Sequence, residues 1–206
     1  MFQNSMRAGE FRYNMNMKTL FILAGANGSG KSTIAKELLP EENIVYVNAD
    51  DIARELCPQD MQSVRIQAGK ELHARIDKLF SEGKSFALES TLSGVGHTKT
   101  IETAHKLGYD VVIIYVFVAT PQDCIGRIQM RVKNGGHPVP EEDVIRRFDR
   151  SKQNFWHLYK DKVDFWALYY NGGENVVPVA DQEVGHPIEI LTENLYTVFT
   201  RDLWLN

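Results

Sequence analysis

Cysteine is scarce in this chain of 206 residues, which carries only Cys57 and Cys124. Two cysteines far apart in the sequence match no metal-ligand spacing, so we expect reduced thiols and no cysteine-bound metal. Long hydrophobic runs are also missing. The longest run, residues 111–119, is far shorter than the roughly 20 residues that a membrane span needs. We therefore expect a cytoplasmic protein with no membrane partner.

An excess of positive charge is absent as well. Lys and Arg number 23 against 27 Asp and Glu, and the net charge of −4 gives the whole protein no attraction to nucleic acid. Nucleic acid is therefore not an expected partner. Hydrophobic residues make up 43% and charged residues 24%, a balance typical of a folded globular domain. Residues 1–16 are polar and without period, so we expect a disordered or expression-derived extension, followed by one domain over residues 17–206.

Strand and helix signals alternate from residue 18 onward. Short apolar runs, typical of strands buried on both faces, occur at 19–24, 44–47, 85–88, 111–118 and 165–170. Helical patterns occupy 31–39, 51–56, 62–81 and 97–107, two more begin at Pro121 and near Pro140, and a closing helix is expected at 188–203. This order predicts an α/β fold, a mainly parallel five-stranded sheet with helices on both faces, with run 111–118 at its centre.

Apolar spacing also predicts the buried faces of two helices. In helix 62–81 the predicted buried residues are Ile66, Leu72, Ile76, Leu79 and Phe80. In the helix after Pro140 they are Ile145, Phe148, Phe155, Trp156 and Tyr159, which leaves Arg146, Arg147 and Arg150 on the opposite side.

A phosphate-binding motif follows the first apolar run. The pattern G-x-x-x-x-G-K-S is complete in Gly25, Ala26, Asn27, Gly28, Ser29, Gly30, Lys31 and Ser32. Its glycines let backbone N–H groups point at a phosphate, and the following helix adds the positive end of its dipole. We expect Lys31 to reach the β- and γ-phosphates, Ser32 to bind Mg²⁺, and Thr33 to belong to the same nucleotide-binding set. The motif thus predicts that a nucleoside triphosphate binds here.

Acidic residues follow two of the predicted strands. The second strand runs into Asn48 and Asp50, and the third into Glu89 and Thr91. Ligands of open α/β sheets bind beyond the carboxyl ends of the strands, so these residues should face the phosphate-binding motif. Asp50 is a candidate base for an accepting hydroxyl, but its position equally fits an N-cap of the helix that begins near Ile52. Asn48, Glu89 and Thr91 are candidates for substrate binding, and Glu89 alternatively for the outer shell of the magnesium.

Residues 127–152 are rich in Lys and Arg, although the chain as a whole is acidic. The glycine pair at 135–136, followed by His137, separates two helices as a hinge would. We predict a helical lid whose arginines contact the triphosphate and stabilise charge in the transition state: Arg127, Arg131, Arg146 and Arg147. A solvated charged surface is the alternative. The single helical histidines His73, His97 and His105 are assigned no function.

Together these motifs resemble the zeta-toxin family of P-loop kinases over roughly residues 18–170. The resemblance rests on the P-loop, on Asn48-Ala49-Asp50, on Glu89-Ser90-Thr91, and on the stretch 131–140 with Arg146-Arg147. It implies a shikimate-kinase-like core that uses ATP and Mg²⁺ to phosphorylate the 3′-hydroxyl of a UDP-N-acetyl amino sugar. It also implies that Asp50 is the catalytic base and that Glu89 and Thr91 hold the sugar nucleotide. Arg131, with Arg146 or Arg147, would then reach the ATP phosphates.

One position departs from the toxins, which carry an arginine where this chain has Ser93. We therefore expect ATP-dependent phosphorylation of a hydroxyl on a small molecule, such as a sugar or nucleotide sugar, with UDP-N-acetylglucosamine a poor acceptor. Two other classes stay open. One is a 5′-end kinase of nucleic acids. The other is a nucleotide-dependent toxin or interaction module that acts through an antitoxin-like protein partner.

Overall fold

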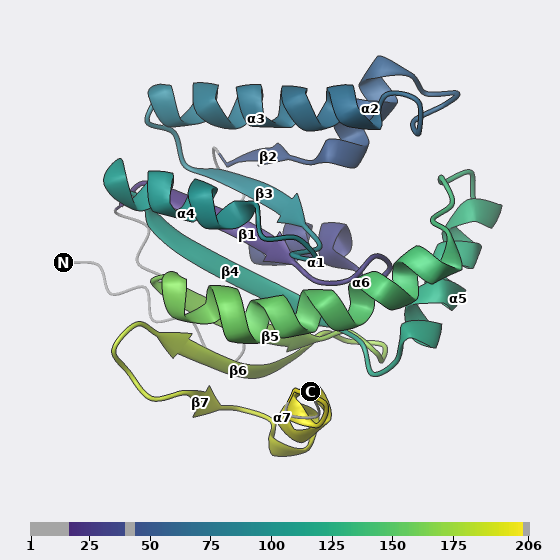
Figure 1. Ribbon diagram of the computed structural model, residues 1–206. Coiled ribbons are helices and arrows are strands. Elements are labelled where there is room, and N and C mark those ends of the chain that lie inside the picture. Colours follow the sequence, from purple (N-terminus) through teal and green to yellow (C-terminus); the bar gives the residue numbers. More distant parts are fainter. Residues whose placement is uncertain (1–16, 40–43, 204–206) are drawn as a thin grey trace.

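The computed structural model describes residues 17–39 and 44–203, so the predicted extension 1–16 lies outside the described residues. Figure 1 shows the elements along the chain. They are β1 (Thr19–Ala24), α1 (Lys31–Leu38), β2 (Val45–Val47), α2 (Ala49–Leu56), α3 (Arg65–Ser81), β3 (Phe86–Ser90), α4 (His97–Lys106), β4 (Asp110–Phe117), α5 (Pro121–Lys133), α6 (Glu141–Asn154), the π-helical turn η1 (Phe155–Tyr159), the 3-10 turn η2 (Lys160–Lys162), β5 (Phe165–Tyr170), β6 (Val177–Glu183), β7 (Glu189–Ile190) and α7 (Glu193–Thr200).

The sheet has seven strands in the order β2-β3-β1-β4-β5-β6-β7. The five predicted strands all form, run parallel to one another and place β4 at the centre. The predicted number of five is nevertheless wrong, because β6 and β7 extend the sheet in antiparallel fashion beyond β5. Both lie near one edge and carry Pro178, Gln182 and Glu189, so neither reads as a continuous apolar run. β7 also occupies part of the predicted closing helix, which is confined to α7.

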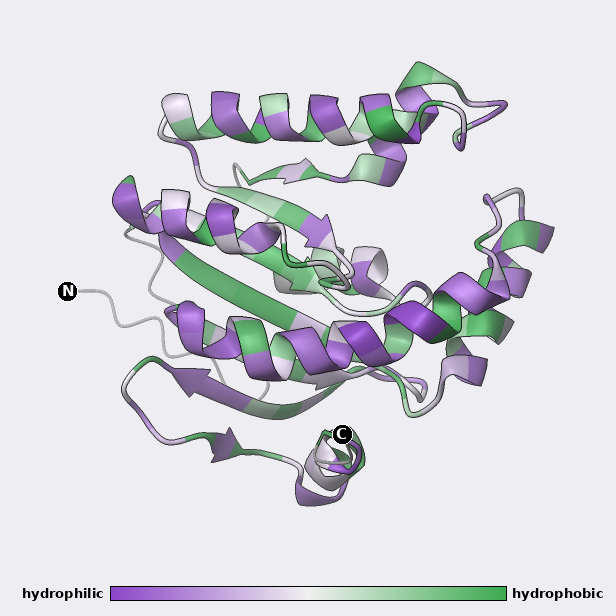
Figure 2. Ribbon diagram, viewed as in Figure 1, coloured by the Kyte–Doolittle hydropathy of each residue, from purple (hydrophilic) through white to green (hydrophobic). Residues whose placement is uncertain are grey.

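The core lies on both faces of the central strands. Successive side chains of β1 alternate between them, so that Leu20 and Ile22 pack on one face while Phe21 and Leu23 pack on the other. Figure 2 shows β1 and β4 as hydrophobic ribbons, whereas the outer sides of the covering helices are hydrophilic. Buried residues of α3, α4 and α7 join the first face, and those of α1 join the second. Helices on both faces are thereby confirmed.

Two predicted buried faces are corrected by the structure. Ile66 is 79% exposed and Ala68 is buried in its place, because the buried residues of α3 recur every three or four positions from Ala68 and Ile66 is out of phase with them. On α6, Ile145 is 44% exposed and the neighbouring Val144 is buried. Val144, Phe148, Ser151 and Phe155 recur every three or four residues and form the packed side, and Ile145 is out of phase with them.

No helix formed by residues 17–39 and 44–203 is both long and apolar enough to cross a lipid bilayer.

Candidate active site

The P-loop connects β1 to α1 at the carboxyl edge of the sheet. Gly25 has a φ of +136°, and a Cβ there would lie 2.1 Å from the backbone oxygen of Val116. Gly30 has a φ of +95° and ends the loop directly before α1. Both positions therefore require glycine. The Lys31 side chain is 5% exposed and folds back over the loop, donating from Nζ to the backbone oxygen of Ala26 at 3.0 Å.

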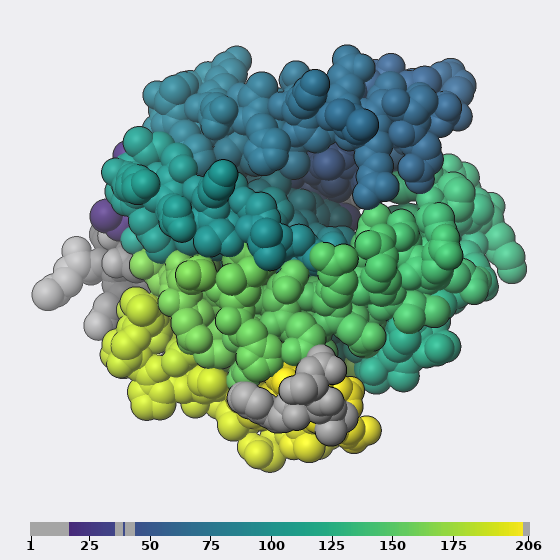
Figure 3. Space-filling view, in the orientation of Figure 1, coloured from purple at the N-terminus to yellow at the C-terminus, as the bar shows by residue number. Residues whose placement is uncertain are grey.

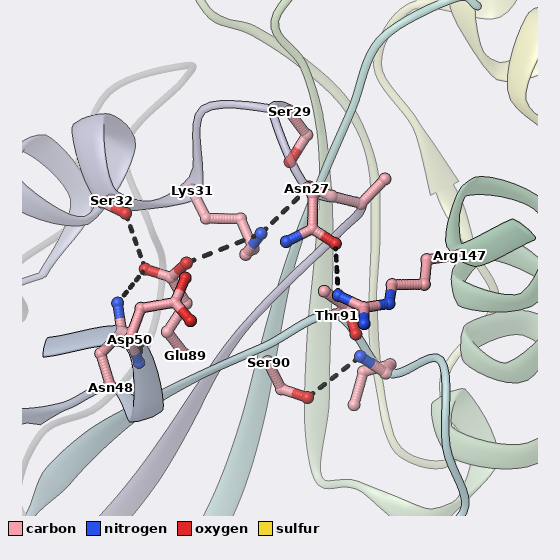
Figure 4. Close-up of polar contacts among 12 residues, drawn as sticks. Asn27, Ser29, Lys31, Ser32, Asn48, Asp50, Glu89, Ser90, Thr91 and Arg147 are labelled. Atoms are coloured by element: carbon pink, nitrogen blue, oxygen red, sulfur yellow. Dashed lines mark hydrogen bonds and ion pairs between the residues drawn. The ribbon is translucent and has the colours of Figure 1, made fainter. Parts of the chain in front are cut away.

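Glu89 meets the P-loop from the neighbouring strand. The parallel register pairs Leu23 of β1 with Glu89, so the carboxylate emerges beside the loop. Its Oε1 lies 3.6 Å from Lys31 Nζ, and its Oε2 accepts from Ser32 Oγ at 2.7 Å. Figure 4 shows Lys31 and Ser32 both directed at this carboxylate. The sequence-predicted phosphate and metal residues thus share one acidic neighbour.

Tyr46 is a member of this cluster that the sequence reasoning missed. Its hydroxyl donates to Glu89 Oε2, as does Asn48 Nδ2 at 3.3 Å. Burial and the adjacent Glu89 charge raise the pKa of the Tyr46 phenol, so it remains a donor at any physiological pH. In the sequence Tyr46 looks like one more apolar strand residue. Only the placement of β2 beside β3 brings its hydroxyl to the carboxylate.

Asp50 does not cap its helix. The cap of α2 is Asn48, whose Oδ1 accepts from the backbone N–H of Asp50 at 2.9 Å. The capping alternative for Asp50 is therefore wrong. Its carboxylate is about half exposed, at 49%, and lies in the first turn of α2 beside Asn48 and Glu89, as Figure 4 shows. In this position the group is free to face a ligand in front of the P-loop.

His137, from the loop between α5 and α6, reaches across to Asp50. Its Nε2 lies 3.7 Å from Asp50 Oδ2, and its backbone oxygen accepts from Arg131 Nη2 at 3.0 Å. Burial lowers the pKa of His137, the Asp50 charge acts in the opposite direction, and Arg131 and Arg54 lower it further. The hinge histidine and the candidate base are thus electrostatic neighbours.

This pair makes a prediction for pH titration. We expect NMR to show the His137 imidazole titrating below its ordinary range, so that it is neutral near pH 7. Asp50→Asn removes the one neighbouring charge that raises this pKa, and should therefore lower it further. Asp77→Asn, on the exposed surface of α3, serves as the matched control and should leave it unchanged. An unchanged or raised His137 pKa in Asp50→Asn would contradict the pairing.

The four lid arginines divide into two groups. Arg127 Nη1 donates to the backbone oxygen of Ser29 at 3.4 Å, and Arg147 Nη1 donates to Asn27 Oδ1 at 3.2 Å. Both therefore contact the P-loop. Arg131 instead binds the backbone of the hinge, and Arg146 pairs with Asp143 on the exposed side of α6. A phosphate-binding role for these two stays a prediction.

Arg147 was placed on the solvent side of its helix by the sequence pattern, and that placement is wrong. It follows the buried Val144 by three residues, so it lies near the packed side of α6. Asn171, which directly follows β5, also contacts the P-loop by donating from Nδ2 to the oxygen of Ser29 at 2.8 Å. No motif marks Asn171 in the sequence.

Arg147 and its neighbour Arg146 provide a matched pair for mutation. Because Arg147 touches the P-loop, we expect Arg147→Ala to cut ATP turnover by about 10²-fold, the scale for one lost transition-state donor. Arg146→Ala should have the smaller effect on turnover. Steady-state ADP formation and ADP binding are measured for both variants. If Arg146→Ala proves the more damaging change, the arginine contacts seen here are not those of the reaction.

Thr91 begins a short loop that leads from β3 to α4. Its Oγ1 lies 2.9 Å from Ser93 Oγ, so the two hydroxyls form a pair. Ser90 Oγ lies 2.8 Å from Nε2 of His97, whose pKa burial lowers to about 4. His97 thus stays neutral and supports the loop, a role that its isolated position in the sequence did not reveal.

The oxygen groups beside Lys31 suit magnesium. Ser32 offers a hydroxyl and Glu89 a carboxylate, and Mg²⁺ binds oxygen ligands while keeping several of its waters. Among the described residues no group of three or more His, Cys, Asp or Glu could hold a metal by itself. The donor set fits a cation that is shared with a nucleotide phosphate.

Figure 3 shows a hollow between the α2–α3 part of the chain and the α5–α6 part. The P-loop cluster lies at the base of that hollow, because it comprises the carboxyl ends of β1, β2 and β3. Asp50 approaches from α2, and Arg147 from α6. The candidate active site is thus bordered by both parts.

Comparisons with known proteins give a matching family and a relative of this chain. The profile of AAA_33, an AAA domain family, matches residues 20–155, which include the P-loop, Asp50, Glu89 and the lid. An uncharacterized protein of Haemophilus influenzae is 33% identical over 134 residues, which make up 65% of this chain and 94% of that protein.

Solved structures share the fold at low sequence identity. A chain of the AvrRxo1-ORF1:-ORF2 complex with ATP aligns with a TM-score of 0.70 and 18% identity, over 89% of this chain. This chain spans 64% of that one, less than two thirds of its length. A chain of the PezAT toxin-antitoxin system of Streptococcus pneumoniae aligns with a TM-score of 0.60 and 19% identity, over 96% of this chain and 82% of its own length. The resemblance to toxin kinases is confirmed at the level of the fold. The chain belongs to the AAA_33 family of AAA domains and has the nucleotide-binding P-loop kinase fold.

Proposed function

We propose that this protein transfers the γ-phosphate of ATP to a hydroxyl group of a small molecule. The observation that carries the proposal is the convergence of Lys31 and Ser32 of the P-loop with Glu89 and Asp50 at the ends of two neighbouring strands. A cradle for the triphosphate, an oxygen donor set for Mg²⁺ and a half-exposed carboxylate are the groups that phosphoryl transfer to a hydroxyl requires.

Each residue then has a chemical task. Lys31 and the P-loop backbone bind the phosphates, and Ser32 would hold a magnesium ion, which would supply positive charge to the transferring group. Glu89 keeps the Ser32 hydroxyl and the Lys31 ammonium in place through its two oxygens. Asp50 orients the accepting hydroxyl and takes its proton. Arg147, with Arg127, brings positive charge to the same loop from the lid.

The acceptor would lie in front of Asp50, Asn48 and Thr91. These groups offer carboxylate, amide and hydroxyl oxygens, which suit a polyhydroxylated molecule such as a sugar. Ser93 adds a hydroxyl rather than a cation, and it is already paired with Thr91. The exposed Arg54 does not supply the missing cation, because its guanidinium is engaged with Asp51 at 2.6 Å.

We therefore expect UDP-N-acetylglucosamine to be a poor acceptor. The test is phosphotransfer from labelled ATP to that sugar nucleotide, in parallel with free sugars, nucleosides and short oligonucleotides carrying a 5′-hydroxyl. Asp50→Asn is run beside the wild type, so that transfer can be assigned to this site. Efficient 3′-phosphorylation of the sugar nucleotide would overturn the expectation about Ser93. Transfer restricted to oligonucleotide ends would overturn the small-molecule proposal.

An antitoxin-like protein partner also stays a prediction. It is supported at the level of the fold by the AvrRxo1-ORF1:-ORF2 and PezAT assemblies, whose chains resemble this one at 18% and 19% identity. Wild-type ATP turnover that no acceptor accelerates would favour such a partner-dependent role over metabolite phosphorylation.

A further inference from the structure

Helix α6 contacts two functional loops from one side. Arg147 donates to Asn27 of the P-loop at 3.2 Å, and Asn154 donates from Nδ2 to the backbone oxygen of Leu92 at 2.7 Å. The two residues are seven positions apart, which is about two helical turns, so their side chains leave the same side of the helix. The helix therefore spans the distance between the nucleotide loop and the loop that carries Thr91.

The loop contacted by Asn154 has an unfavourable backbone. Leu92 has a φ of +51°, and it is the non-glycine residue with positive φ among the described residues. A side chain with a Cβ rarely adopts this conformation without support from its surroundings. Leu92 is also buried, and its N–H donates to Ser90 Oγ at 3.0 Å.

The remaining support comes from the end of α6 and the turn after it. Besides the bond from Asn154 to Leu92, the buried Tyr159 donates its hydroxyl to the backbone oxygen of Gly94 at 2.7 Å. Tyr159 ends the π-helical turn η1, which adds a wide turn directly after Asn154. Such turns occur frequently at functional sites. Two side chains from one short stretch thus hold two carbonyl groups of one loop.

Leu92 separates Thr91 from Ser93, so its backbone angles set how their side chains are oriented. The 2.9 Å contact between the Thr91 and Ser93 hydroxyls depends on that conformation. If Leu92 relaxed to a negative φ, the two hydroxyls would no longer point to the same side. The ability of Thr91 and Ser93 to meet an acceptor together is therefore tied to the contacts of Asn154 and Tyr159.

We propose that Asn154 and Tyr159 are positioning residues that hold residues 91–94 in the conformation that recognises the acceptor. Through α6 they keep this acceptor loop in a defined place relative to the P-loop. The assignment of residues 91–94 to acceptor binding rests on the proposed function. The positioning of these residues by Asn154 and Tyr159 rests on the hydrogen bonds and the backbone conformation described above.

The decisive variant is Asn154→Asp, which keeps the shape of the side chain and removes the donor. Amide hydrogen exchange of peptides covering 91–96 is measured by mass spectrometry. We expect exchange there to accelerate by about tenfold, the usual effect of losing one buried hydrogen bond. Tyr159→Phe removes only the hydroxyl and should accelerate exchange in the same peptides, while Asn154→Gln should restore part of the protection. Gln153→Ala is the matched control, because Gln153 donates to Asp202 instead.

A second readout separates positioning from general destabilisation. Binding of Mg²⁺ with the non-hydrolysable analogue AMP-PNP, measured by calorimetry, should change less than about twofold in Asn154→Asp, well under the tenfold that 1.4 kcal/mol would give. With an acceptor found by the panel above, Asn154→Asp should raise its KM about tenfold while the KM for ATP stays within about twofold.

Unchanged exchange over residues 91–96 would overturn the proposal, as would faster exchange spread over the whole chain. The exchange measurement requires no turnover. Faster hydrogen exchange confined to residues 91–96, in a protein that phosphorylates no member of the panel, would therefore refute the proposed function. It would still support Asn154 and Tyr159 as positioning residues for this loop.

Discussion

Replacing Lys31 is expected to abolish measurable phosphoryl transfer, with a loss of about 10²- to 10³-fold or more, the scale for one lost charged contact to the transition state. Lys31 is the cation of the P-loop and is nearly buried between the Ala26 carbonyl and Glu89. Its ammonium is therefore already placed where a phosphate would come to lie. ADP formation by Lys31→Met and Lys31→Ala is compared with the wild type. The methionine variant retains the aliphatic stem and hence most of the packing.

The control for this prediction is Lys106→Ala. Lys106 is exposed at the C-terminal end of α4, so this variant should keep wild-type turnover. Circular dichroism and thermal melting establish that the Lys31 variants are folded. Wild-type turnover in a folded Lys31→Ala protein would show that the P-loop is not the site of ATP hydrolysis.

Replacing Asp50 should separate chemistry from binding. Asp50→Asn keeps the size of the side chain but cannot take a proton, so we expect transfer to fall by about 10²-fold or more while ATP binding is retained. Asn48 caps α2, which leaves Asp50 without a capping role whose loss could lower the melting temperature. Transfer rate, ATP affinity and melting temperature are measured on the same preparation.

Asp51→Asn is the matched control, because Asp51 is the neighbouring acid and its carboxylate pairs with Arg54. A loss confined to Asp50→Asn supports the role of a base. If instead both variants transfer phosphate at the wild-type rate, the proton must leave the acceptor by another route.

The features that could be predicted from the sequence are those that depend on residues close together along the chain. Gly25 and Gly30 have to be glycines for backbone reasons, so the P-loop is visible as a pattern. The central strands β1 and β4 are buried on both faces and therefore read as continuous apolar runs. Helix α5 begins at Pro121 as predicted, and Thr120 caps it through a capping box with Asp123.

What escaped prediction depends on contacts between distant segments. Tyr46, Asn154 and Asn171 carry no motif, and each acquires its role from a partner at least 40 residues away. Arg147 was misplaced because the exposed Ile145, and not the neighbouring Val144, was assigned to the buried side of α6. The half-exposed strand β6 lacks an apolar run, since only Val179 and Ala180 along it are buried.

The two outermost strands of the sheet have a consequence for the behaviour of the protein at high concentration. An exposed sheet edge presents unpaired backbone N–H and C=O groups, which can pair with another chain and start aggregation. Here one edge ends in β2, with three residues, and the other in β7, with two. Edges this short offer little length for intermolecular strand pairing. The apolar central strands, which would aggregate readily if they were exposed, are thereby kept from contact with other molecules while the fold is intact.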